Sequence, residues 1–210
     1  MSPGSRQTRT CLITTGEATV TDYQEQKAGL LETIRRAANG GVDLVQIREK
    51  ALNARLLFDL TRSAVDALLG TNAKVLVNDR ADIAMAAGAQ GVHLPANSIS
   101  PFAVRLFAPR GFIVGLSTHT LEEAVAARDE GASFITFGPI FASEGKPDPA
   151  GSPALREVCE ALAGFPVYAL GGLDASNVAE AVKAGASGVA AIRALNETRQ
   201  RLDLLNKLAR

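Results

Sequence analysis

The sequence is poor in the residues that form disulfide frameworks and metal clusters. Its 210 residues include two cysteines, Cys11 and Cys159, and two histidines, His93 and His119. Each cysteine lies in or beside an apolar segment, and neither belongs to a C-x-x-C or histidine-spaced cluster. Both are therefore expected to be reduced packing residues of a cytoplasmic protein. Neither histidine has a second histidine nearby, which argues against a zinc site.

The chain also lacks an excess of either charge and any long hydrophobic run. Lys plus Arg and Asp plus Glu number 22 each, so no overall field would attract nucleic acid or an anionic membrane. The polar N-terminus is followed by only a short apolar stretch, residues 11–13, which does not resemble a secretory signal, and no stretch is apolar enough to span a bilayer. We therefore expect no nucleic-acid or membrane partner, and local basic groups at any anion site.

What the chain does have is a repeated alternation of helix and strand signals. A glycine followed by a short apolar run recurs at residues 40–44, 87–92, 130–134 and 184–189. The glycine suits the left-handed position that ends a helix, and the run suits a strand buried on both faces. Eight strands are predicted on this basis, at residues 11–14, 44–47, 75–77, 91–94, 113–115, 134–137, 167–170 and 188–192. Eight helices are predicted after them, at residues 24–38, 54–69, 81–87, 101–107, 121–129, 153–163, 176–184 and 198–208.

This alternation predicts an α/β fold, a single (β/α)8 TIM barrel. One domain spanning residues 1–210 is expected, with residues 1–9 as a flexible N-terminus. A doubly wound open sheet is the alternative, but eight evenly alternating units favour closure.

Polar side chains follow the second and third predicted strands directly. Gln46, Arg48 and Lys50 alternate and should point to the same side, and Asn78 and Asp79 end the neighbouring strand. Such a set would bind a polyanion at the carboxyl ends of the strands, and Asp79 could hold Mg²⁺ together with phosphate oxygens. The alternative is a rim of structural ion pairs, in which Glu49 pairs with a helix cation.

Two further segments suggest anion binding. Gly171 and Gly172 follow the seventh strand, and many barrels bind a phosphate between the loops after strands seven and eight. The long connection at residues 142–152 is rich in Gly and Pro yet carries Lys146, which is typical of a lid. A tight turn and an inert surface loop are the respective alternatives. Ser117 and His119, at the end of the fifth strand, could donate hydrogen bonds to a phosphate or a base ring.

Six short motifs in this order resemble the thiamine phosphate synthase family and the related thiazole tautomerase family. The motifs are Val45-Gln46-Ile47-Arg48-Glu49-Lys50, Val77-Asn78-Asp79-Arg80, Gly91-Val92-His93-Leu94, Gly115-Leu116-Ser117-Thr118-His119-Thr120, Phe137-Gly138-Pro139-Ile140-Phe141 and Leu170-Gly171-Gly172-Leu173. The resemblance extends from about residue 11 to residue 195.

The resemblance implies a transferase that joins 4-amino-2-methyl-5-hydroxymethylpyrimidine diphosphate to a thiazole phosphate and releases pyrophosphate. It implies a diphosphate site, an Mg²⁺ ligand at Asp79, and catalytic roles for Arg48, Lys50, Lys146 and Ser117. The diphosphate substrate would be bound by Gln46, Arg48, Lys50, Asn78, Ser117, Ser143 and Lys146, and the thiazole phosphate by Gly172, Ala191 and Ile192.

The chain departs from the synthase pattern at three places. Where synthases carry a second Mg²⁺-binding Asp this chain has Ser98, one hydroxyl of the lid motif is absent, and Arg193 replaces a usual Ser in the last strand. The stretch around Ser98 looks more like the tautomerases. Those enzymes, however, commonly carry a His where this chain has Pro139, and often lack the Asp kept here as Asp79. We therefore favour the synthase.

The sequence is also compatible with three other functions. A tautomerase would isomerise a thiazole carboxylate phosphate without metal, and a non-catalytic module would bind thiamine phosphate without turnover. A Schiff-base enzyme would follow from Lys50 at a strand end. Small phosphorylated substrates are the expected partners, and a homodimer is compatible with such a barrel.

Overall fold

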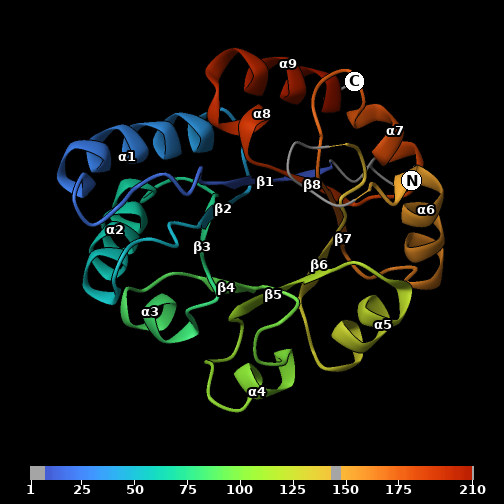
Figure 1. The fold of residues 1–210 in the computed structure, drawn as a ribbon, viewed down its shortest axis with the longest axis horizontal. Coiled ribbons are helices and arrows are strands. Elements are labelled where there is room, and N and C mark those ends of the chain that lie inside the picture. The colour runs from blue at the N-terminus through green and yellow to red at the C-terminus, as the bar shows by residue number, and fades with distance from the viewer. Residues whose placement is uncertain (1–7, 143–147, 210) are drawn as a thin grey trace.

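Eight parallel strands form a closed barrel in the order in which they occur along the chain. The computed structural model describes residues 8–142 and 148–209. Figure 1 looks down on the ring of strands, with the helices arranged around its outside. The strands are β1 (Arg9–Ile13), β2 (Leu44–Ile47), β3 (Lys74–Asn78), β4 (Gly91–Leu94), β5 (Ile113–Thr118), β6 (Phe134–Phe137), β7 (Val167–Leu170) and β8 (Gly188–Ala191). The predicted TIM barrel is thus confirmed.

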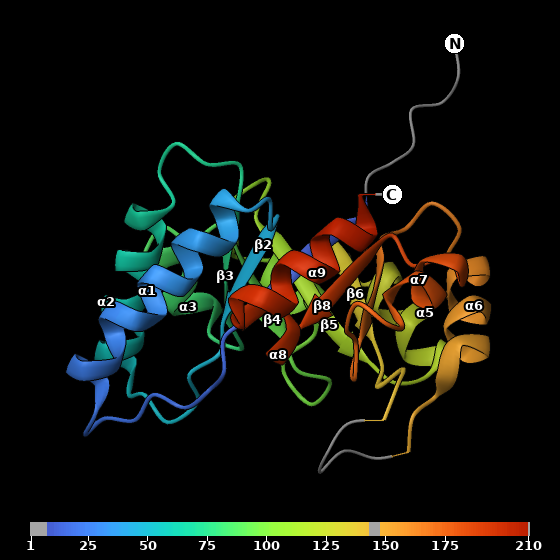
Figure 2. The ribbon, with the colours of Figure 1, turned by 90° about the horizontal axis from the view of Figure 1, so that it is seen from above.

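Nine helices cover the barrel in the described part of the chain. They are α1 (Tyr23–Asn39), α2 (Ala54–Ala67), α3 (Ala81–Ala86), α4 (Pro101–Arg105), α5 (Leu121–Asp129), α6 (Gly151–Ala161), α7 (Val178–Lys183), α8 (Arg193–Asn196) and α9 (Thr198–Leu208). The side view in Figure 2 shows them flanking the strands. The four-residue helix α8 was not predicted. No helix among the described residues has the length and apolar character needed to cross a membrane.

The core has two layers because successive strand residues face opposite sides of the sheet. Inside the barrel, Cys11, Leu44, Leu76, Phe134 and Tyr168 belong to one buried cluster. A larger apolar cluster fills the space between the outer face of the strands and the helices. Both cysteines are free, and burial raises the pKa of the Cys11 thiol to about 12 and that of Cys159 to about 11. These values agree with their predicted packing role.

The barrel closes between the first and the last strand. The register pairs Arg9 with Gly188 and Cys11 with Ala190. Arg9 was expected in a flexible N-terminal segment, but it begins β1, and its amide donates to the Ser187 carbonyl at 3.1 Å. Beyond the other end of both strands, the Asn196 side chain donates to the carbonyls of Ile13 and Ile192, at 2.8 Å each. Closure is therefore supported by polar contacts at both ends.

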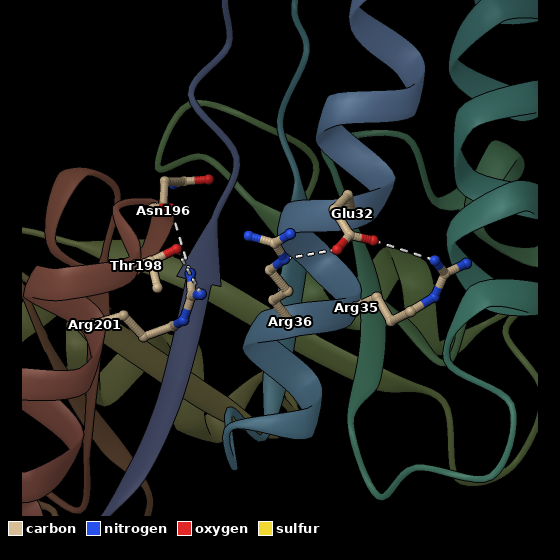
Figure 3. Close-up of polar contacts among 6 residues, drawn as sticks. All are labelled: Glu32, Arg35, Arg36, Asn196, Thr198 and Arg201. Carbon is tan, nitrogen blue, oxygen red and sulfur yellow. Dashed lines mark hydrogen bonds and ion pairs between the residues drawn. The ribbon is translucent and has the colours of Figure 1, made fainter.

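A buried arginine holds the last two helices together. Arg201 on α9 is 3% exposed, and its guanidinium donates to the carbonyls of Leu195 at 2.9 Å and Asn196 at 3.3 Å. Figure 3 shows Arg201 beside Asn196 and Thr198, whereas Arg36 on α1 turns to Glu32. Arg201 satisfies carbonyl groups that a helix as short as α8 would leave without partners.

Candidate active site

The polar side chains that end β2 and β3 meet at the carboxyl end of the barrel. Gln46 is 2% exposed, and its Nε2 donates to Asn78 Oδ1 at 3.0 Å. Gln46 Oε1 is buried and has no hydrogen-bond partner in the described structure. A buried acceptor without a partner costs free energy unless something supplies a donor. Gln46 Oε1 therefore has an acceptor capacity that the described residues do not use.

Glu49 positions the loop that follows β1. Its carboxylate is buried and accepts hydrogen bonds from the amides of Gly16, at 3.1 Å, and Ala18, at 2.9 Å. The Arg48 amide donates to Thr14 Oγ1 at 2.8 Å. The proposed alternative in which Glu49 pairs with a helix cation is therefore wrong, because backbone amides satisfy this carboxylate. Glu49 instead joins the β1 loop to the segment that carries Arg48 and Lys50.

Arg48 lies against this loop at Gly16. Gly16 has φ of +82°, and a Cβ added to it would lie 3.2 Å from Arg48 Nη1 and 3.1 Å from the Arg48 carbonyl. A side chain at this position would therefore displace the guanidinium. The missing Cβ allows the half-buried Arg48 and the loop to lie close together.

Lys50, Asn78 and Asp79 line one cavity of about 390 Å³, which Asn97 also borders. Asp79 has φ of +64°, in the left-handed region that Asp tolerates better than most residues. Its amide donates to the His93 carbonyl at 2.9 Å, which fixes this conformation. The neighbouring Arg80 pairs with Asp82 at 2.6 Å. The structure thus brings together the cation and the carboxylate predicted at the ends of β2 and β3.

Ser98 lies next to Asp79, because its hydroxyl donates a hydrogen bond to Asp79 Oδ1. Ser98 and Ser117 also border a second cavity, of about 230 Å³. Within residues 8–142 and 148–209, no three His, Cys, Asp or Glu side chains are grouped to hold a metal ion. One carboxylate with an adjacent hydroxyl fits an ion such as Mg²⁺, which usually takes its other ligands from substrate phosphates and water.

The end of β5 carries the remaining predicted polar residues. Ser117 Oγ accepts a hydrogen bond from Thr136 Oγ1 at 3.4 Å. His119 contacts the Gly138 carbonyl through Nδ1 at 2.5 Å, and its amide donates to Glu123 at the start of α5. These contacts orient the β5 and β6 loops. His93 is buried inside the barrel, and this burial lowers its pKa to about 4.

The glycines after β7 are required by close packing of backbone on backbone. A Cβ on Gly171 would lie 2.6 Å from Pro139 Cα, and one on Gly172 would lie 2.6 Å from the Ala142 carbonyl oxygen. Their φ angles are +100° and +63°. The tight-turn alternative therefore accounts for both glycines. It does not exclude a phosphate, because the Gly172 amide donates to no acceptor in the parts of the chain that the structure describes.

The last strand presents its residues to different layers. Ala191 packs in the outer cluster, so its side chain faces the helices, whereas Ile192 packs against the cluster inside the barrel. Arg193 is exposed and begins α8. The amides of Ile192 and Arg193 have no acceptor among the described residues. Any phosphate here would be bound through backbone N–H groups rather than through the Ala191 side chain.

Two predicted residues, Ser143 and Lys146, lie outside the described residues. The lid at residues 142–152 therefore remains a prediction. Three residues that shape the site were not predicted in that role, namely Thr14, Glu49 and Thr136. The only signal for Glu49 in the sequence is an acidic residue between the basic residues Arg48 and Lys50. The only signal for Thr136 is a single polar residue inside an apolar strand.

Comparisons with known proteins identify the family of the chain. The family model described as thiamine monophosphate synthase matches residues 18–195. A thiamine-phosphate synthase of Anaeromyxobacter dehalogenans is 46% identical over 165 residues, which cover 77% of this chain and 73% of that protein. One of Methanoculleus marisnigri is 41% identical over 164 residues, 77% of each chain.

Solved structures give the same result. A thiamine phosphate pyrophosphorylase from Pyrococcus furiosus superposes with a TM-score of 0.83 at 26% identity, covering 97% of this chain and 96% of that one. The family, the barrel and the transferase class expected from the sequence are therefore confirmed. The chain belongs to the thiamine monophosphate synthase family.

Proposed function

We propose that this protein joins 4-amino-2-methyl-5-hydroxymethylpyrimidine diphosphate to a thiazole phosphate, giving thiamine phosphate and pyrophosphate. The observation that carries the proposal is the arrangement at the ends of β2 and β3. Gln46 bonds to Asn78, while Lys50 and Asp79 border one cavity. Cations, amides and one carboxylate at the carboxyl end of a TIM barrel match the chemistry of a diphosphate site. The relatives' shared activity supports the same assignment.

The reaction breaks the bond between the pyrimidine methylene carbon and the diphosphate oxygen. The electron pair leaves with pyrophosphate, and the thiazole nitrogen then forms a bond to the methylene carbon. The leaving group gains negative charge in the transition state. Arg48 and Lys50 are already in position before the reaction, so they stabilise the transition state more than the bound substrate. Lys146 and Ser143 would add to this effect if the lid closes as predicted.

Gln46 is the residue that we assign to the pyrimidine. Its Oε1 atom is a buried acceptor without a partner among the described residues, and the amino group of the pyrimidine is a donor of matching polarity. Asn78 holds the Gln46 amide in this orientation at 3.0 Å. The amino group of the bound pyrimidine would therefore donate a hydrogen bond to Gln46 Oε1. A ring without an amino group would leave this acceptor unsatisfied, so aminopyrimidines should bind more tightly.

Asp79 would hold Mg²⁺, with Ser98 beside it. When bound, the ion would neutralise part of the diphosphate charge. Ser98 contributes no charge and shares its proton with Asp79, so we infer a weaker metal site than two carboxylates would form. For the thiazole phosphate, we assign the amides of Gly172 and Ile192 at the ends of β7 and β8, which have no acceptor among the described residues. The Ala191 contribution would be limited to its backbone.

A direct assay tests the function. Purified protein with Mg²⁺ and both substrates should form thiamine phosphate, and Lys50→Ala should lower kcat/KM on the order of 100-fold. Lys74→Ala is the matched control. Lys74 is exposed at the opposite end of β3, so this variant should lose little activity.

Absence of product with the wild type, together with tight thiamine phosphate binding, would instead select a binding module. Metal-free isomerisation of the thiazole carboxylate phosphate would select a tautomerase.

A cytoplasmic location and a homodimer also remain predictions. Sedimentation of the purified protein would determine the oligomeric state. The expected substrates are small and phosphorylated, as the family membership supports.

A further inference from the structure

A row of hydrogen-bonding groups runs from the barrel interior to Ser117 near the carboxyl end of β5. His93 Nε2 lies 3.3 Å from Thr136 Oγ1, and Thr136 Oγ1 lies 3.4 Å from Ser117 Oγ. The three residues come from β4, β6 and β5, which are adjacent in the barrel. Ser117 lines the cavity of about 230 Å³. His93 and Thr136 are 2% and 1% exposed.

Packing fixes the histidine ring in this row. A Cβ on Gly115, the residue paired with His93, would lie 2.6 Å from His93 Cδ2 and 2.5 Å from Phe134 Cζ. The absence of a side chain at Gly115 therefore creates the space that both rings occupy. The His93 and Phe134 rings contact each other with centroids 5.6 Å apart. The ring cannot turn away from Thr136 without disturbing this packing.

Each hydroxyl in the row has one proton to donate, so the donor and the acceptor of each hydrogen bond are fixed along the row. The structure directs the Thr136 proton to Ser117 Oγ. Thr136 Oγ1 can then only accept from His93, which requires the proton of the neutral ring to lie on Nε2. His93 is 2% exposed inside the barrel, a setting that disfavours a charged ring, and a neutral ring carries a single proton. Ser117 donates to no group in the described structure, so its own proton is available to a ligand.

We propose that His93 and Thr136 are positioning residues that direct the Ser117 hydroxyl proton toward the departing pyrophosphate. The proposal rests on the function proposed above. A hydrogen-bond chain in a low-dielectric interior polarises its members, so each donor strengthens the next. The row thus supplies a neutral hydrogen-bond donor for the leaving group.

The first test does not depend on activity. Nitrogen-15 NMR of the imidazole groups reports which ring nitrogen carries the proton. We expect His93 in the wild type to be the Nε2–H form, and Thr136→Val, which removes the acceptor but keeps the shape, to shift the signal of that nitrogen. A His93 ring protonated on Nδ1 would overturn the proposal, whatever reaction the protein catalyses.

The second test is a double-mutant cycle on the reaction. Thr136→Val should lower kcat about 10-fold with little change in KM, and Thr136→Ser should restore it. If Thr136 acts through Ser117, adding Thr136→Val to Ser117→Ala should lower kcat no further. Independent, multiplying losses would overturn the positioning role. An inactive wild type would refute the proposed function instead, and the NMR result would still decide the direction of the row.

Discussion

Single side chains determine the properties of the proposed Mg²⁺ site and the response of the protein to pH. Ser98 is the clearest case, because its hydroxyl bonds to the carboxylate that would hold Mg²⁺. We predict that Ser98→Asp lowers the Mg²⁺ concentration needed for half-maximal activity by about 10-fold or more, since a second carboxylate adds charge at the ion. Titration calorimetry with Mg²⁺ alone gives a readout that is independent of turnover.

Ser100→Asp is the matched control for this substitution. Ser100 caps α4 by accepting from the Ala103 amide at 3.2 Å, and Asp caps helices equally well. It adds the same charge two residues away, without the contact to Asp79. Equal gains from both variants would show that overall charge, rather than a ligand at Ser98, sets the affinity.

His93 predicts a dependence of stability on pH. In the folded state it binds its proton near pH 4, because burial lowers its pKa, whereas an unfolded histidine binds one near pH 6.5. Unfolding therefore takes up a proton between these values, and the free energy of unfolding should fall as pH falls below about 6.5. At pH 5.5 the loss should be about 1.4 kcal/mol, and above pH 7 this contribution vanishes.

Urea unfolding at pH 7.5, 6.5 and 5.5 measures this dependence. His93→Gln should remove it, whereas His119→Gln, which alters an exposed histidine, should retain it. Identical slopes for wild type and His93→Gln would show that other groups cause the acid sensitivity.

Among the elements, the loops after β6 and β7 depend on glycine for contact between their backbones. We predict that Gly172→Ala destabilises the protein by about 3 kcal/mol. Of this, about 1 kcal/mol comes from the left-handed conformation and the rest from the 2.6 Å approach to the Ala142 carbonyl. Gly164→Ala is the control, because Gly164 has φ of +88° with nothing near its Cβ position. Equal losses in denaturant unfolding would mean that the clash relaxes at no cost.

The first and last residues of a strand could be predicted where the strand corresponds to one short apolar run in the sequence. The predicted bounds of β2, β4, β6 and β7 match the structure, as do those of α5, whose Thr120 side chain accepts from the Glu123 amide. Helix α8 could not be predicted, because four residues are too few to show a helical period. The predicted α6 began two residues late, since Gly151 at φ of +78° reads as a loop residue.

Site residues could be predicted from the sequence only where polar residues alternate along a strand or end neighbouring strands. Gln46 and Asn78 were placed together because neighbouring parallel strands end at one edge. The partners of Glu49 come from the β1 loop more than thirty positions earlier, and nothing in its local sequence indicates them. The Thr136 contacts likewise depend on the register between β5 and β6.

For the whole molecule, the junction of α8 and α9 adjoins the place where the barrel closes, because Asn196 also contacts Ile13 of β1. We predict that Arg201→Met costs about 2–3 kcal/mol, because the Leu195 and Asn196 carbonyls lose a charged donor while the aliphatic packing is kept. Arg199→Met alters an exposed residue of the same helix and should stay within about 0.5 kcal/mol. Thermal unfolding compares the two. Similar melting temperatures would show that Arg201 is replaceable.

Pairing β1 with β8 also sets an order of events while the chain is synthesised. Residues 9–13 form the first of the eight strands to be synthesised, and their partners at residues 188–191 form the last. Until then one border of the nascent sheet exposes unpaired amides and carbonyls, which can recruit other chains. Chaperone demand and losses to inclusion bodies should therefore concentrate in this interval, and slower translation would prolong it.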